Sequence, residues 1–161
     1  IGSPLAALGD LADGGAPEYE GKQEEIISQW KENLVALAEK CPNVVVKIGG
    51  LLMPQLGHKL DQREVPASSE ELATLFGPLY LFVIETFGPE RCMFESNFPV
   101  DKVSTNYTIL WNMFKRMTTG MPDADRLQLF SGTAKRIYRL DPGAIDNPGD
   151  KKRSSYVVSK V

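Results

Sequence analysis

The chain has 161 residues, 42% of them hydrophobic and 24% charged, which provides enough apolar side chains for one folded core. This composition excludes a collagen-like or disulfide-rich protein, and it excludes disorder over most of the length. With 21 acidic against 18 basic residues the chain has no basic surface for nucleic acid, and no apolar run approaches the roughly 18 residues of a membrane span. We therefore expect neither nucleic acid nor a membrane as partner.

Few side chains suit metal or thiol chemistry. His58 is the single histidine, and Cys41 and Cys92 lie in apolar surroundings without the close spacing of a metal or redox pair. Reduced structural thiols of this kind are typical of a cytoplasmic protein, which is the localisation we expect. A catalytic zinc site needs about three protein ligands, so the chain is expected to hold no metal by itself.

The first third of the chain predicts a loop, a helix and a strand. Residues 1–22 are rich in Gly, Ala, Asp and Pro, which is typical of a long loop. Residues 24–41 follow a helical period that Pro42 ends. The expected apolar face consists of Ile26, Trp30, Leu34, Leu37 and Cys41. Residues 44–48 are mostly β-branched and precede two glycines, which predicts a buried parallel strand.

The middle of the chain predicts a second helix and a second strand. A polar loop over residues 53–69 carries His58. The next helix begins at residue 69 or 70, and a kink is expected near Pro78. It ends at residue 87, because a glycine and a proline follow that residue. Residues 92–97 form the second short strand.

Two helices and a tail follow. The helices are expected over about residues 104–119 and 123–139. Their expected buried residues are Tyr107, Leu110, Trp111, Phe114 and Met117 in the first and Leu127, Phe130, Ala134, Ile137 and Tyr138 in the second. Residues 141–161 combine Pro, Gly and charges without periodicity, so we expect a flexible polar tail there.

The order helix, strand, helix, strand, helix, helix belongs to the α/β class. Alternation of this kind is typical of βα units around a parallel sheet. Two strands are too few for a sheet whose faces and edges are covered by this number of helices. The pattern alone therefore indicates a piece of a larger α/β protein.

One stretch carries a resemblance to a known family. Residues 87–101 read FGPERCMFESNFPVD, which resembles the last barrel strand of the amidohydrolase-related (amidohydrolase 2) family of metal-dependent hydrolases, where FGPxRhhFGSDWP is common. Residues 30–50 are similar to the preceding helix and seventh strand of that family, and residues 129–140 to its closing helix. Residues 2–4 resemble the loop after its sixth strand.

The resemblance implies a fold and a domain organisation. Residues 1–140 are expected to be the C-terminal part of a TIM (β/α)8 barrel, about the last two strands and their helices. Such a barrel usually takes about 250 residues, so we expect it to be incomplete in this chain. The flexible tail over residues 141–161 then lies outside the barrel.

Alternation along the two strands predicts one pair of facing charges. The valines and the isoleucine of the first strand share a face that is expected against helices, so Lys47 points to the opposite side. Glu95 on the second strand points the same way, into the lumen of a barrel. Because a buried unpaired charge is costly, we predict an ion pair between Lys47 and Glu95, with either a structural or a substrate-binding role.

Asn97 stands where the family carries an aspartate, so the resemblance makes it a candidate catalytic residue. The family's aspartate binds metal and moves the proton of metal-bound water, whereas an amide cannot act as a general base. Either another group is the base, with Asp101 and Glu95 the nearest candidates, or the site binds a molecule without hydrolysing it. Asp101 has a second interpretation as a turn or helix-entry residue.

His58 lies in the loop that the resemblance places on the substrate side of the barrel. It is a candidate substrate-binding residue, and the alternative is a solvated loop histidine. The HxH metal pair of the family has no counterpart in the chain. A divalent, zinc-like metal is therefore expected only in a longer parent protein.

Two functions are consistent with the resemblance. The first is a fragment of a metal-dependent hydrolase that acts on a small-molecule lactone, ester or amide, or decarboxylates a small acid, and is inactive as an isolated chain. The alternative is a non-catalytic small-molecule-binding or scaffold protein on a degenerate barrel, marked by Asn97. A partial barrel leaves a strand edge unpaired, so a second copy or a complementing barrel chain is the expected protein partner.

Overall fold

A computed structural model describes Pro4 and residues 21–140 of the chain. The tail predicted over residues 141–161 and, apart from a few residues, the predicted loop over residues 1–22 lie outside the described residues, as does most of the motif at residues 2–4. The helices are α1 (Gln23–Lys40), α2 (Ser69–Phe87), α3 (Tyr107–Met117), α4 (Asp123–Leu127) and α5 (Thr133–Ile137). No helix in this part of the chain is long and apolar enough to cross a membrane.

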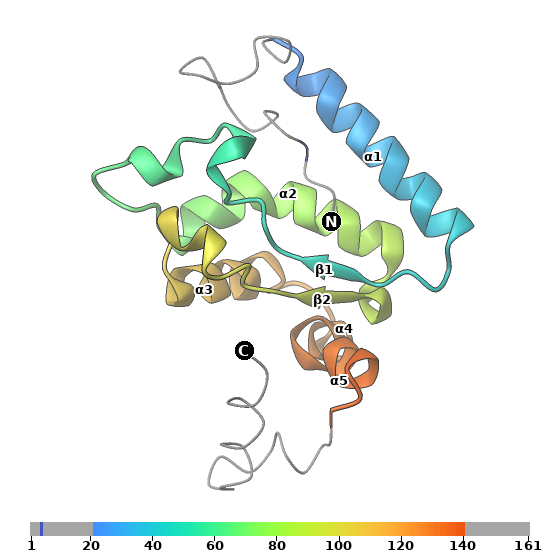
Figure 1. Cartoon of the computed structure of the whole chain (residues 1–161). Coiled ribbons are helices and arrows are strands. Elements are labelled where there is room, and N and C mark those ends of the chain that lie inside the picture. The colour runs from blue at the N-terminus through green and yellow to red at the C-terminus, as the bar shows by residue number, and fades with distance from the viewer. Residues whose placement is uncertain (1–3, 5–20, 141–161) are drawn as a thin grey trace, which may run out of the picture.

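The described part is an α/β fold with mostly helices and few strands (Figure 1). β1 (Val46–Ile48) pairs in parallel with β2 (Cys92–Phe94), and Lys47 lies opposite Met93. Along the sheet, α1 lies on the side of β1, and α4 and α5 lie on the side of β2. The core packs β1 and β2 against α2 and α3, while Lys47 and Met93 lie on the opposite face of the sheet.

Hydrogen bonds explain why both strands are shorter than predicted. The Val44 N–H donates to the Cys41 carbonyl at 3.1 Å, so the chain is still in a turn two residues before β1. At the other end, the Glu95 N–H still donates to the Ile48 carbonyl at 3.0 Å, and the chain turns away at Asn97, whose φ is +52°. The length of each strand is set by its pairing with the other strand, and this pairing cannot be read from the sequence of either strand alone.

α1 confirms the predicted helix but not all of its buried face. Trp30, Leu34 and Ala38 are buried, since a spacing of four residues keeps them on one side of the helix. Leu37, which we predicted on this face, is 39% exposed because it lies at the edge of the buried side of the helix. The helix ends at Lys40, two residues before Pro42.

α2 begins and ends where the sequence predicts. The Ser68 hydroxyl accepts a hydrogen bond from the Glu71 N–H at 3.1 Å and caps the first turn. Gly88, with φ +82°, ends the helix, and its N–H donates to the Ile84 carbonyl. Pro78 lies within the helix on its exposed side.

α3 starts later than predicted, because Asn106 caps it. The Asn106 side chain accepts from the Ile109 N–H at 2.9 Å, so the helix begins at Tyr107 rather than near residue 104. Tyr107, predicted as buried, is 54% exposed at this first position. Leu110 and Phe114 are buried as predicted.

The predicted helix over residues 123–139 is interrupted, and its buried face was predicted only in part, since Phe130 does pack against the core. A π-helical turn over Gln128–Gly132 separates α4 from α5. A π turn takes more residues than an α turn and therefore shifts the inward face. Leu129 and Thr133 are buried as a result, while several residues predicted to point inward are exposed. These exposed residues are Leu127, Ile137 and Tyr138.

Candidate functional site

Lys47 and Glu95 form the ion pair that strand alternation predicted. Lys47 Nζ donates to Glu95 Oε2 at 2.5 Å, across the ends of β1 and β2. The hydrogen bond that Lys47 donates to Glu95 raises the pKa of Lys47, so the ammonium stays charged at every physiological pH. The Lys47 side chain is 51% exposed and that of Glu95 is 23% exposed, so within the described residues the pair is open to solvent on one side.

Two glycines allow the strand ends to approach closely. A Cβ atom placed on Gly49 would lie 2.4 Å from Glu95 Cγ and 2.7 Å from the Glu95 carbonyl oxygen. Gly50 has φ +81°, and a Cβ atom there would lie 3.5 Å from Asn97 Nδ2. The first glycine leaves space for Glu95 and the second turns the chain beneath Asn97.

Asn97 and Asp101 form a second polar pair just beyond β2. Asn97 has φ +52°, a left-handed conformation that asparagine adopts more readily than most residues. Its Nδ2 donates to Asp101 Oδ1 at 2.8 Å. The Asp101 side chain is fully buried, so a carboxyl group lies beneath an amide that is only half-buried.

Burial dominates the electrostatics of Asp101. It raises the pKa of this carboxyl to about 6, although the Asn97 amide and the backbone N–H groups of Gly50 and Leu52 act in the opposite direction. Asp101 Oδ2 is buried and makes no hydrogen bond of normal geometry among the described residues. The group is therefore mostly ionised at pH 7 and titrates near the edge of the physiological range.

Asp101 also has the turn role that the sequence left open. It lies in a 3-10 turn over Val100–Val103, and its carbonyl accepts from the N–H groups of Ser104 and Thr105. Its own N–H donates to the Asn97 carbonyl at 3.1 Å. The backbone thus fixes Asp101 as a turn residue while its side chain points at Asn97.

Tyr80 is a residue of this region that the sequence did not reveal. It is fully buried on α2, and its hydroxyl accepts from the Leu51 N–H at 3.2 Å, one residue beyond Gly50. Burial raises the pKa of Tyr80, and the charges of Asp101 and Glu95 add to that effect. In the sequence Tyr80 is one more aromatic residue of an apolar helix, so no pattern separated it from the core.

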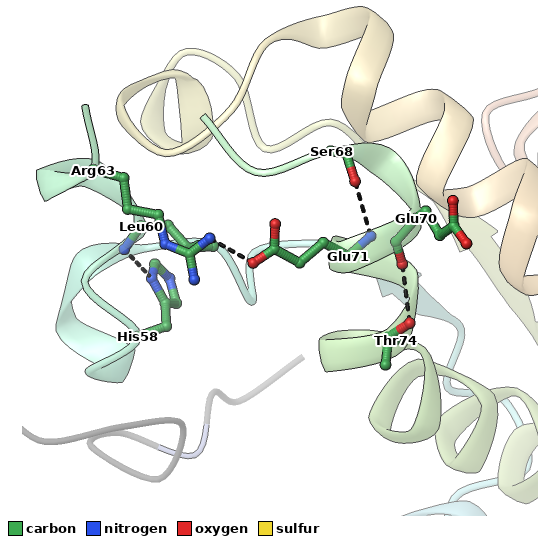
Figure 2. A network of polar contacts seen from close by, with 7 residues as sticks. All are labelled: His58, Leu60, Arg63, Ser68, Glu70, Glu71 and Thr74. Atoms are coloured by element: carbon green, nitrogen blue, oxygen red, sulfur yellow. Dashed lines mark hydrogen bonds and ion pairs between the residues drawn. The ribbon is translucent and has the colours of Figure 1, made fainter. Parts of the chain in front are cut away.

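His58 lies in the loop before α2, next to Leu60 (Figure 2). Its Nδ1 accepts from the Leu60 N–H at 3.1 Å, and its ring packs edge-on against Phe76 with 5.7 Å between centroids. Burial lowers the pKa of His58, so the ring is mostly neutral at pH 7. His58 is half-buried, and substrate binding by this residue stays a prediction.

The described residues do not assemble a metal centre. No group of three or more His, Cys, Asp and Glu side chains in this part of the chain is placed to hold a metal ion. Both cysteines are free, and burial raises the pKa of Cys92 to about 12, which suits a structural thiol. Asn97 and Asp101 supply one amide and one carboxylate, too few for a zinc site by themselves.

Comparison with known proteins decides the family. The family model described as Amidohydrolase matches residues 14–140, well over half of the chain. The chain is a member of the amidohydrolase family. The predicted resemblance to this family is thereby confirmed.

Two proteins are similar to this amidohydrolase in sequence, and two solved structures are similar to it in fold. The chain is 36% identical over 111 residues to the uncharacterised protein y4mH of Sinorhizobium fredii, covering 69% of this chain and 33% of that protein. It is 29% identical over 120 residues to an L-fucono-1,5-lactonase of Burkholderia multivorans, covering 74% of this chain and 38% of the lactonase. The chain thus spans between a third and two fifths of the length of these relatives.

The solved structures are two crystal forms of an amidohydrolase from Burkholderia multivorans. One contains bound zinc and superposes with a TM-score of 0.64 at 26% identity, over 87% of this chain and 42% of that chain. The other contains bound HEPES and gives a TM-score of 0.62 at 25% identity, over 76% of this chain and 40% of that chain. The described fold is therefore similar to part of a larger amidohydrolase.

Proposed function

We propose that this chain is the C-terminal part of a TIM-barrel amidohydrolase that hydrolyses a small-molecule lactone, ester or amide. The observation that carries the proposal is the pair of polar contacts at the ends of two parallel strands, Lys47 with Glu95 and Asn97 with Asp101. TIM barrels build their active sites at the carboxyl ends of their strands. On this proposal the remaining strands belong to sequence outside this chain, and the isolated chain is inactive.

The charges suggest a division of work within the proposed site. Lys47, which stays protonated, binds the carbonyl oxygen of the substrate and stabilises the negative charge that develops there. Glu95 holds the ammonium in place, and its partly exposed carboxylate can accept a proton from water. Asn97 binds a polar group of the substrate, while Asp101 is buried behind it.

A lactone is the substrate class that we favour, because one relative is an L-fucono-1,5-lactonase. Decarboxylation of a small acid remains within the proposal, since one fold supports many reactions. A divalent metal is proposed only for the complete protein. The described residues form no group that would hold it, and the roles given above to Lys47, Glu95 and Asn97 are those of their own side chains.

The test is an assay of the complete protein that contains this sequence. We expect it to open sugar lactones such as L-fucono-1,5-lactone, measured by acid release with a pH indicator. Lys47→Met should lower kcat/KM by about 100-fold, the loss expected for one group that stabilises developing charge. Lys102→Met, which removes an exposed lysine of the nearby turn, is the matched control and should stay within about twofold of the parent.

One observation favours the non-catalytic alternative. Asn97 cannot act as a general base, and its amide is engaged with Asp101. A binding or scaffold protein on a degenerate barrel would bind sugar lactones or related rings and turn none of them over. If the complete protein hydrolyses no lactone, ester or amide and decarboxylates no small acid, the binding function replaces the hydrolase.

A further inference from the structure

The hydrogen bond between Asn97 and Asp101 fixes which end of the amide is free. An ionised carboxylate accepts hydrogen bonds and donates none, so the NH2 group of Asn97 must face Asp101. The 2.8 Å contact joins these two groups. The carbonyl oxygen Oδ1 of Asn97 must therefore point away from Asp101.

Asp101 is held rigidly enough to impose this orientation. Its side chain is fully buried, and its backbone N–H and carbonyl are both hydrogen-bonded within the turn that follows β2. On the other side, the Asn97 amide faces Gly50, where an added Cβ atom would lie 3.5 Å from Nδ2, an ordinary contact distance. The amide thus lies between a fixed carboxylate and a glycine.

The free end of Asn97 is accessible. No described donor reaches Oδ1, and the atom does not belong to the buried polar atoms that lack a partner in this part of the chain. Asn97 as a whole is half-buried. A ligand at the strand ends would therefore meet a carbonyl oxygen of fixed direction.

We propose that Asp101 is a positioning residue that holds Asn97 with Oδ1 toward the bound molecule, so that this part of the site accepts a hydrogen bond from a hydroxyl group of a neutral substrate. The choice of ligand rests on the proposed function, whereas the positioning does not. An anionic group at this point would face the Oδ1 lone pairs and the negative charge of Asp101, whereas the charge of Glu95 is balanced by Lys47. A hydroxyl donor satisfies Oδ1 without that repulsion.

The positioning is tested without a substrate, by NMR of the complete protein labelled with 15N-asparagine. The signal that disappears in Asn97→Gly, a substitution that keeps φ +52° accessible, identifies the Asn97 amide. We expect its protons to exchange slowly in the parent. Asp101→Ala should accelerate exchange by about tenfold, and Asp101→Asn, whose own carbonyl oxygen can accept from Nδ2, should stay within about twofold. Equal exchange in the parent and in Asp101→Ala overturns the positioning role.

The hydroxyl preference is tested by calorimetry with a sugar lactam, in which nitrogen replaces the ring oxygen of a lactone, and with its monodeoxy forms. One deoxy form should bind the parent protein about five- to tenfold more weakly, the loss of one hydrogen bond. This difference should vanish in Asp101→Ala and in Asn97→Gly and persist in Asp101→Asn. If Asp101→Ala does not fold, the comparison of Asn97→Gly with Asp101→Asn decides.

The two readouts separate this inference from the proposed function. Slow exchange that depends on Asp101 together with no binding of any sugar lactam supports the positioning and overturns the hydroxylated substrate class. Lactone hydrolysis with the same hydroxyl preference in the parent and in Asn97→Gly supports the hydrolase and overturns the role of Oδ1. Loss of the preference in Asp101→Asn would show that the charge of Asp101, rather than its acceptor atom, is required, and it also overturns the inference.

Discussion

Gly49 has the tightest surroundings at the junction of the two strands. It does not need a left-handed backbone; what it needs is the absence of a side chain, because Glu95 occupies the space. Both a side-chain carbon and a backbone oxygen of Glu95 would be closer than 3 Å to an added Cβ atom. A backbone atom cannot move aside as a flexible side chain can, so the two strands would have to separate.

Gly49→Ala should therefore destabilise the protein by about 1–3 kcal/mol, the usual cost of overpacking. Urea unfolding measures the change. Gly120→Ala is the control, because nothing lies within 4 Å of an added Cβ at Gly120 and its φ is not left-handed. It should be neutral or slightly stabilising. Equal effects of the two substitutions would contradict the close approach of Glu95 to Gly49.

Asp101 makes stability depend on pH with a sign opposite to that of a paired surface carboxylate. Its pKa is about 6 in the folded protein against about 3.9 in the unfolded chain. Between these values the folded state binds more protons, so stability falls as pH rises from about 4 to about 6 and stays low above that range. The full effect of such a difference is about 3 kcal/mol.

Asp101→Asn removes this titration. The unfolding free energy of the variant relative to the parent should rise by about 1–3 kcal/mol between pH 4.5 and pH 7.5. Urea titrations at both pH values measure it, and comparison at each pH cancels the other titrating groups. Asp123→Asn, an exposed carboxyl at the start of α4, should show little such change. A constant difference for Asp101→Asn at the two pH values would contradict the raised pKa.

At the residue scale the sequence predicted contacts that follow from strand alternation and missed those that follow from packing. Lys47 and Glu95 were paired correctly, because a period of two and parallel order are enough to bring them together. The bond between Asn97 and Asp101 required the left-handed backbone of Asn97, which no periodicity encodes. Tyr80 belongs to the site only because its hydroxyl accepts a hydrogen bond from the Leu51 N–H in the folded chain.

At the scale of elements, α2 has a start signal that is readable in the sequence and visible in Figure 2. Ser68 and Glu71 have the spacing of a capping box, and the Ser68 hydroxyl does accept from the Glu71 N–H. The Glu71 carboxylate instead pairs with Arg63 at 2.5 Å. This pair ties the loop that carries His58 to the first turn of α2.

Ser68→Ala should lower the free energy of unfolding by about 1 kcal/mol, because one N–H of the first turn loses its acceptor. Thermal or urea unfolding measures the loss. Thr74→Ala, one turn further along, is the control, since the Thr74 hydroxyl only bonds back to the Glu70 carbonyl within the helix. It should be neutral or stabilising, because alanine has the higher helix propensity. A loss in Thr74→Ala as large as that in Ser68→Ala would contradict the capping role.

Helix boundaries were predictable where a cap or a proline marks them, and helix faces were not predictable where the helix is irregular. Pro42 and Gly88 marked the ends of α1 and α2 to within one residue. The π turn before α5 has no sequence signal of comparable strength, and it moved Thr133 into the core. There the Thr133 hydroxyl donates to the carbonyl groups of Pro89 and Glu90, a contact between distant segments that only the folded chain contains.

At the scale of the whole molecule, the central sheet has only two strands in the described part of the chain. Each strand therefore has one edge that no described strand covers, and parallel strands in other proteins are normally covered on both faces and paired on both sides. Arg91 partly closes one end of this arrangement. It donates to the carbonyls of Phe87 and Ala38 at 2.8 and 3.3 Å and so joins the ends of α2 and α1.

On the proposal that the chain is part of a barrel, the 161 residues expressed alone should self-associate or unfold over a broad temperature range, because the strand edges and the face that carries Lys47 would then lack their covering strands. Light scattering after size exclusion and a thermal melt followed by circular dichroism measure this. The complete protein is the control and should be monodisperse with a cooperative melt. Co-expression with the preceding part of the protein should restore that behaviour. A sharp melt from a strictly monomeric 17.8 kDa species would show that the chain is a finished fold and would contradict its assignment as part of a barrel.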